Sequence, residues 1–275
     1  MAPAVACGQA FSEERRHTQR LLGGLVKIEE EAQMAVQSSR QTGRDTVSRA
    51  VAPRWKALSG TGGVAALSML ALMIVQIIVY MYMIWPPPTT VESYFRLFDE
   101  SWLLGPLSLD LLYLVDTVPL VLIYLALYVV LRSAGEPAML VAAVLGIVGV
   151  AAYFASNPAF DKMSLIKQYK VATTEAERTA LTTVGQAMLE MYTGTAFDVY
   201  CVLKTIVFFL ISPVMLRSGL FTRLTASLGL APGFLMIVPS SAGILGLYFS
   251  LASLVPWAAW LWLVARRLRQ YGRGR

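Results

Sequence analysis

Residues 224–265 read LTASLGLAPGFLMIVPSSAGILGLYFSLASLVPWAAWLWLVA and contain no Asp, Glu, Lys or Arg. Residues 57–91 and 137–160 are also free of charged side chains, so the three runs hold 42, 35 and 24 residues. An α-helix that crosses the ~30 Å hydrocarbon core of a bilayer needs about 20 apolar residues. The three runs therefore predict an all-α, polytopic membrane protein.

The composition of the whole chain agrees with this class. Of 275 residues, 56% are hydrophobic and 15% are charged, and the mean hydropathy is +0.59. Globular domains are about 45–50% apolar and about 25% charged. The one histidine, His17, lies in the polar N-terminal segment. Haem ligation inside the membrane, a histidine-rich metal site and a Ser–His catalytic pair therefore lack an imidazole, and we expect neither a metal nor a cofactor.

The apolar runs and the signals that end them predict six transmembrane helices. Pro86-Pro87-Pro88 ends the first span and Asn157-Pro158 ends the third, because a proline disfavours helix at the residue before it. Residues 1–56 carry nine basic and six acidic residues, which predicts a mostly disordered, basic cytosolic tail before a transmembrane domain at 57–270. The expected spans are 63–85, 104–131, 138–156, 195–216, 224–238 and 243–265.

Basic residues determine the expected orientation, because cytoplasmic loops of membrane proteins carry an excess of Lys and Arg. Such residues gather in the N-terminal tail, at Arg132 and Arg217, and in the C-terminal run from Arg266 to Arg269. We therefore expect both termini on the cytoplasmic side (N-in/C-in) of a multi-pass protein of a cell membrane.

The longest segment between spans, 157–193, has a helical pattern of its own. Residues 174–177 read TEAE, which matches a capping box. The apolar residues that follow at helical spacing are Leu181, Val184, Met188 and Met191. This spacing places them on one helical face, so we expect an amphipathic external helix that lies on the membrane surface or on the other spans.

Four strings carry a resemblance to a known family. They are WPPPTT at 85–90, LSLDLLYLVD at 107–116, YFASNPAF at 153–160 and YTGTAFDVY at 192–200. Over residues 55–270 the chain resembles the bacterial membrane proteins of the domain of unknown function 4386 family. The resemblance implies a six-helix protein of the bacterial inner membrane, and it brings no activity and no functional residues. Lys204 stands where we would expect a neutral residue in this family.

Ionisable side chains inside a membrane are costly, and each is by default a candidate for function. Those within the expected spans are Asp110, Asp116, Asp198 and Lys204. At ~1.5 Å per residue, Asp116 and Lys204 lie about 24 and about 20 Å from the basic residues at the inner ends of their spans. They can therefore share a level if the two helices are neighbours, whereas Asp110 and Asp198 come close to the outer interface.

Three interpretations of these two residues stay open, and the third is that their side chains reach the membrane interface by snorkelling or lie exposed there. In the first, Asp116 and Lys204 form a buried ion pair that fixes the register of two helices. In the second, both line a polar pocket with Tyr113 and Asp198 that binds a small polar ligand or passes a proton. Pro119 favours the second, because a proline inside a helix frees the backbone carbonyl four residues earlier.

The expected function is that of a non-catalytic multi-pass membrane protein with a structural, interaction or small-ligand-sensing role. The alternative is a small-molecule or proton transporter with a polar site around Asp116 and Lys204. An intramembrane aspartyl protease is not expected, because the Gly-x-Gly-Asp element is missing. The expected partners are the lipid bilayer and a small polar ligand, without nucleic acid, and the oligomeric state stays open.

Two further patterns concern helix surfaces. Gly229-x-x-x-Gly233 and Ala142-x-x-x-Gly146 are small-residue pairs at the spacing of close helix contacts, and we expect them to pack helices within the chain. Trp257, Trp260 and Trp262 are expected at the membrane interface or facing lipid, where tryptophan is enriched.

Overall fold

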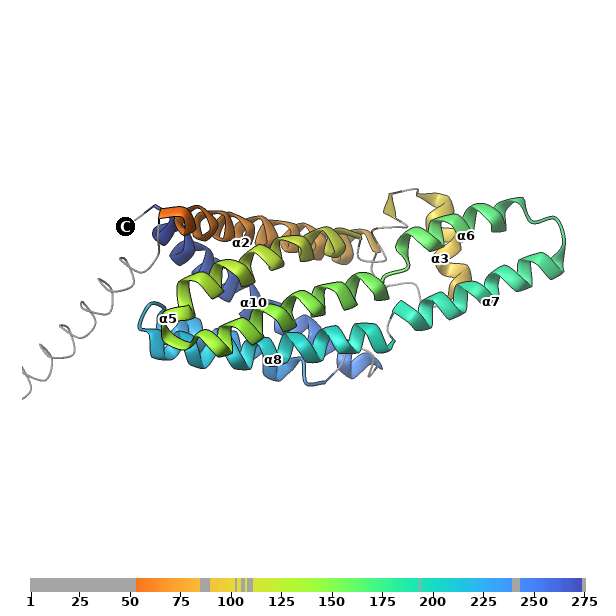
Figure 1. Ribbon diagram of the computed structural model, residues 1–275. Coiled ribbons are helices and arrows are strands. Elements are labelled where there is room, and N and C mark those ends of the chain that lie inside the picture. The colour runs from red at the N-terminus through yellow and green to blue at the C-terminus, as the bar shows by residue number, and fades with distance from the viewer. Residues whose placement is uncertain are drawn as a thin grey trace, which may run out of the picture. The chain divides into compact units, whose positions relative to one another are not determined.

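The computed structural model describes residues 53–84, 90–101, 103–104, 107, 111–192, 194–238 and 243–273. Residues 1–52 of the expected tail lie outside the described residues, and so does Asp110. Every regular element within the described ranges is a helix (Figure 1). The all-α expectation is confirmed for this part of the chain.

The helices form a bundle and a smaller cap. The bundle contains α2 (Pro53–Val79), its π-helical continuation η1 (Tyr80–Ile84), α5 (Leu111–Ser156), α8 (Thr195–Ser218), α9 (Arg223–Leu235) and α10 (Gly243–Gly272). The cap contains α3 (Val91–Glu100), α6 (Ala159–Val171) and α7 (Glu175–Tyr192). In the described part, four helical stretches are long and apolar enough to cross a membrane, and they begin near the starts of α2, α5, α7 and α10.

α5 consists of two helical halves that are joined at Gly135. The backbone there is extended (φ 178°, ψ 66°), and Pro137 close by cannot donate a backbone N–H to a helix. Figure 1 shows α5 doubling back at this point. The halves 111–134 and 136–156 pack on each other, because Gly146 lies directly against the ring of Tyr124 with no room for a side chain. They correspond in place to the expected spans 104–131 and 138–156.

The small-residue pairs bring helices of this chain together, as expected. A Cβ atom on Gly229 of α9 would lie 2.6 Å from Ser212 Oγ of α8 and 2.9 Å from Trp260 Nε1 of α10. α9 is therefore in close contact with both neighbouring helices. The second pair acts inside α5, through the contact of Gly146 with Tyr124.

α9 is the shortest helix of the bundle. Thr222 caps its start, since the Thr222 side chain accepts a hydrogen bond from the backbone N–H of Thr225 (3.2 Å). Its 13 residues span about 20 Å at ~1.5 Å per residue, which is less than the ~30 Å of a hydrocarbon core. The expected span 224–238 is thus represented by a helix that covers only part of that depth.

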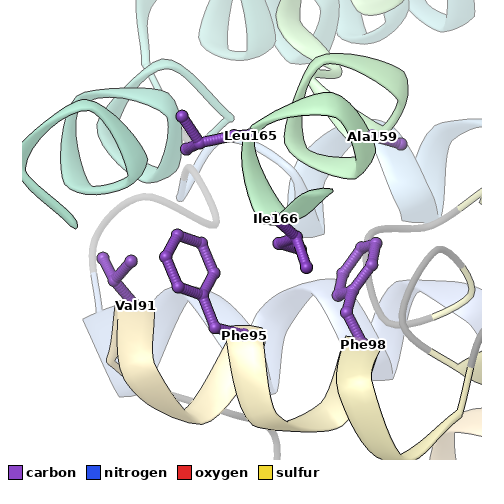
Figure 2. Close-up of a cluster of buried hydrophobic side chains, with 6 residues drawn as sticks. All are labelled: Val91, Phe95, Phe98, Ala159, Leu165 and Ile166. Atoms are coloured by element: carbon purple, nitrogen blue, oxygen red, sulfur yellow. The ribbon is translucent and has the colours of Figure 1, made fainter. Parts of the chain in front are cut away.

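The cap has a hydrophobic core of its own. Figure 2 shows Val91, Phe95 and Phe98 of α3 facing Leu165 and Ile166 of α6. Phe95 also contacts Tyr169 with ring centroids 4.7 Å apart. The cap is therefore held by side-chain packing between α3 and α6, to which α7 adds a third helix.

α7 is the helix expected in segment 157–193, and its capping box is confirmed. Thr174 Oγ1 accepts a hydrogen bond from the backbone N–H of Glu177, and Glu177 Oε2 accepts one from the backbone N–H of Thr174 (both 3.2 Å). The four residues of the expected apolar face differ in their surroundings. Leu181 and Met188 pack against the cap core, whereas Val184 and Met191 are exposed. The buried position on α7 is Gly185, which lets Val91 of α3 approach closely.

Large apolar side chains cover the outside of the bundle. Val115, Val118 and Val144 of α5 and Ile78 of α2 are about half exposed or more. Exposed apolar side chains on several long helices are typical of a surface that faces lipid acyl chains. The buried interior is apolar as well, so the few polar groups inside it require a reason.

Candidate functional site

Lys204 of α8 lies buried inside the bundle at the centre of a small polar cluster. Its side chain is 5% exposed. Lys204 Nζ donates hydrogen bonds to Tyr200 Oη (3.3 Å) and Tyr113 Oη (3.4 Å), and the two tyrosine hydroxyls are 2.8 Å apart. Tyr200 precedes Lys204 by one helical turn, so α8 presents both side chains on the same face.

Aromatic rings hold this cluster in place. The Lys204 ammonium lies 4.7 Å from the ring centroid of Trp257 of α10, within the range of a cation–π interaction. Trp257 in turn stacks on Trp260 with ring centroids 5.2 Å apart and an interplanar angle of 13°. On the other side, Tyr153 packs edge-on against Tyr113 with centroids 5.0 Å apart. These contacts restrict the rotamers of the groups around the ammonium.

The cluster forms part of the wall of a cavity of about 320 Å³, which we call the Lys204 cavity. Its lining comes from α2, α5, α8, α9 and α10 and extends to Tyr94 of α3 and Tyr192 of α7. The apolar part of the lining includes Met73, Ile77, Met236, Leu247, Leu251 and Leu254. The volume lies at the lower end of the range for small-molecule sites, which are mostly apolar with a few placed polar groups.

Among the described residues, Lys204 in this wall has one hydrogen-bond donor left over, and the indole N–H of its neighbour Trp257 is buried without an acceptor. An ammonium carries three N–H donors, and Lys204 uses two of them on tyrosine hydroxyls. Trp257 Nε1 is buried and has no hydrogen-bond partner among the described residues. Buried donors without acceptors cost free energy, so the cavity is chemically suited to a ligand that brings an acceptor.

Asp116 lies near Lys204 without touching it. It is 2% exposed, and neither of its carboxylate oxygens has a hydrogen-bond partner among the described residues. The two side chains are near enough for an electrostatic influence on each other, but no direct ion pair joins them in the described part of the chain. Asp116 is also absent from the described lining of the Lys204 cavity. The structure therefore places the two residues in one region of the bundle. The hydrogen-bond partners of Lys204 are nevertheless the tyrosines and not Asp116.

The other candidates lie apart from the cavity. Asp198 is half-buried in the first turn of α8 and is not among the described lining residues. Pro119 lines a different groove, between α2 and α5. Of the candidate residues in the second expected span, Tyr113 is in the described lining of the cavity.

The interfacial assignment of the tryptophans was wrong for two of the three. Trp257 is 2% exposed and Trp260 is 0% exposed, so both lie inside the bundle, whereas Trp262 is 49% exposed. Trp257 and Trp260 are three residues apart and share one helical face, and the exposed Trp262 lies on another. The three-residue spacing of Trp257 and Trp260 is the sequence signal that could have distinguished these two buried tryptophans from Trp262. The four-residue spacing of Tyr200 and Lys204 could likewise have placed these two side chains on one helical face.

The fold and the site define the class of the molecule as a helical membrane protein with a partly polar cavity inside its bundle. Comparison with protein-family models, curated proteins and solved structures gave no match. The resemblance to the domain of unknown function 4386 family therefore stays a prediction. Among the described residues, no group of three His, Cys, Asp or Glu side chains lies close enough to hold a metal ion.

Proposed function

We propose that this membrane protein binds a small amphipathic molecule whose anionic group contacts Lys204 and whose apolar body fills the Lys204 cavity. The observation that carries the proposal is the third N–H donor of Lys204 Nζ, which has no acceptor among the described residues, in the wall of a mostly apolar cavity of about 320 Å³. The expected roles that agree with such a site are ligand sensing or ligand-dependent interaction.

The charge of the cavity favours an anion over a neutral or cationic ligand. Its described lining has one charged residue, Lys204, and no Asp or Glu. A buried ammonium without a direct ion-pair partner is costly, and an anion that enters the cavity would supply a charge in contact with it and a further acceptor. Hydrogen bonds between ionised groups are the strong ones, so the ligand would be held at its head and by burial of its tail.

We keep binding without turnover or translocation as the role proposed for this cavity. The titratable groups beside Lys204 in the described lining are tyrosines, and the hydroxyls of Tyr113 and Tyr200 accept hydrogen bonds from Lys204 Nζ. Asp116 lies outside the described lining.

We propose six membrane crossings, with both termini in the cytoplasm of a bacterial cell and the protein in its inner membrane. Support comes from the two halves of α5, which can each cross, and from basic residues at the bundle end that carries Lys56, Arg132 and Arg217. Single cysteines placed at Ser218 and at Thr173, in a background without Cys7 and Cys201, test this orientation. An impermeant maleimide added to intact spheroplasts should label Cys at 173 only, and labelling at 218 would overturn it.

The binding proposal is tested with decanoate, an anion with a ten-carbon tail, on the purified full chain in a neutral maltoside detergent. Thermal unfolding and tryptophan fluorescence are followed during titration, and decan-1-ol and decyltrimethylammonium serve as neutral and cationic probes of the same tail. Decanoate should stabilise the protein and change the emission of Trp257, and the other two probes should do so weakly.

Two lysine variants make the test specific. Lys204→Met should lose the response to decanoate, because the anion then lacks its charged donor. Lys167→Met removes an exposed lysine of α6 and should respond like the unmodified chain. An equal response to decanoate and decan-1-ol, or a normal response of Lys204→Met, would overturn the proposal. If proteoliposomes take up decanesulfonate with the unmodified chain but not with Lys204→Met, the proposal of binding without transport would be overturned in favour of transport.

A further inference from the structure

A second hollow lies at the other end of the bundle, away from the cap. It measures about 730 Å³ and lies between the start of α2, the first half of α5 and the end of α10. We call it the basic groove, because Lys56, Arg269 and Arg273 are among its lining residues and no described lining residue is acidic. Figure 1 shows the start of α2 beside the end of α10, at the end of the bundle opposite α3, α6 and α7.

Glycines create this concentration of positive charge by letting α2 and α10 approach closely. A Cβ atom on Gly272 would lie 2.6 Å from the Cα of Gly60, and one on Gly63 would lie 2.8 Å from the backbone nitrogen of Arg269. The two helices therefore meet backbone to backbone. This contact places the arginines at the end of α10 next to Lys56, which is more than 200 residues away in the sequence.

Among the described residues, no acidic side chain forms an ion pair with the basic residues of the groove. The ion pairs of the described residues, Arg96–Glu100 and Lys170–Asp99, both lie in the cap. The C-terminal residues 266–275 contain no Asp or Glu. Three basic residues close together repel one another, so an anion between them would lower the electrostatic energy.

The remainder of the groove is apolar and continues into the outer surface of the bundle. Val64 of α2 is 59% exposed and Val118 of α5 is 54% exposed, and both line the groove together with Leu122 and Pro119. A polar anion such as free phosphate would leave this wall uncovered. A molecule with a phosphate at one end and an acyl chain at the other would match both parts.

We infer that the basic groove binds one anionic phospholipid, with its headgroup phosphate at Lys56, Arg269 and Arg273 and an acyl chain along Val64 and Val118. The chemistry is that of basic pockets between transmembrane helices, which bind acidic lipid headgroups. The groove shares no lining residue with the Lys204 cavity. The two proposals can therefore fail independently.

The experiment is native mass spectrometry of the delipidated full chain, titrated with phosphatidylglycerol, phosphatidylcholine or inorganic phosphate. Phosphatidylglycerol should give one tight adduct, phosphatidylcholine a much weaker one, and phosphate should neither bind nor compete. Each Lys or Arg near an anionic lipid changes affinity about fivefold. The triple variant Lys56→Gln, Arg269→Gln, Arg273→Gln should therefore bind phosphatidylglycerol about 100-fold more weakly.

A matched triple variant separates the groove from diffuse attraction by positive charge. Arg223→Gln, Arg266→Gln and Arg267→Gln remove the same charge at the same end of the bundle, but none of these residues lines the groove. This control should lose less than tenfold. An equal loss in both triples, equal binding of the two lipids, or competition by inorganic phosphate would overturn the inference.

A second pair of variants tests the acyl-chain wall with every charge retained. Val118→Trp fills the groove, whereas Val115→Trp alters an equally exposed position of the same helix that does not line it. Phosphatidylglycerol binding should weaken at least tenfold in the first and stay within twofold in the second. Lys204→Met should keep full lipid binding. Unchanged binding in Val118→Trp would exclude a chain in the groove.

Discussion

The relation between Asp116 and Lys204 can be measured with a double-mutant cycle of Asp116→Asn and Lys204→Met. Two unit charges 4 Å apart interact by about 4 kcal/mol at an effective dielectric constant of ~20. Because no direct ion pair joins the two side chains among the described residues, their coupling should be smaller. We expect about 1–2 kcal/mol of coupling free energy.

The single variant Lys204→Met should change stability little. It removes two hydrogen bonds from a charged donor, at 3.3 and 3.4 Å, which are worth together about 3 kcal/mol at the lower end of the usual range. It also removes the cost of burying an ammonium, which is several kcal/mol. Since these effects oppose each other, the net change in unfolding free energy should stay within about 2 kcal/mol.

The assay is reversible unfolding of the full chain by a denaturing detergent in mixed micelles, for the two single variants and the double variant. Asp116→Asn combined with Lys162→Met is the control cycle, because Lys162 is another buried lysine but lies in the cap. Distant sites should add, so this cycle should show no coupling. A coupling of 4 kcal/mol or more between Asp116 and Lys204 would show a contact ion pair, and additivity would show unrelated charges. Either result would refute the arrangement described above.

Two further predictions concern packing and burial. Gly146→Leu should destabilise the protein by about 2–3 kcal/mol, because the new side chain must displace the ring of Tyr124. The control Val144→Leu, at an exposed position of the same helix, should change the unfolding temperature little. Equal effects of the two variants would contradict the packing of the two halves of α5. Lys162→Met should raise the unfolding temperature, because a buried ammonium without a hydrogen-bond partner is costly. Lys162 Nζ is buried 4.9 Å from the Tyr94 ring centroid and lacks a hydrogen-bond partner among the described residues. A loss of stability would show that the ammonium has an essential partner.

Local sequence patterns predicted much of the fold because their causes are local. A charge-free run such as 224–265 must avoid water whatever it packs against, so it indicates membrane helices without any knowledge of its neighbours. The capping box at Thr174 and Glu177 is equally local, since both partners lie within one turn. The small-residue pairs are of this kind too, because four-residue spacing creates a flat helix face on which another helix can pack.

The candidate site was predicted only in part. Depth along each span could be counted from the sequence, and this placed Asp116 and Lys204 in one region of the bundle, where the structure also has them. The rotation of each helix about its axis could not be derived from the sequence. It is this rotation that turns Lys204 towards Tyr113 and Trp257 and leaves Asp116 out of the described lining of the cavity.

By itself the sequence determined the class of the protein, its long apolar helices and α7, because hydrophobic length and capping act within a few residues. It did not predict α3 and α6 of the cap, and α2 and α10 extend beyond the expected spans 63–85 and 243–265 at their polar ends. The tertiary structure alone decided which polar groups meet. Lys204 and Tyr113 are separated by 91 residues, and Lys56 and Arg269 by more than 200, so no local pattern records their approach. Close contacts at Gly60, Gly146 and Gly229 set the distances between helices. Of these contacts, the one at Gly60 lies in the lining of the basic groove.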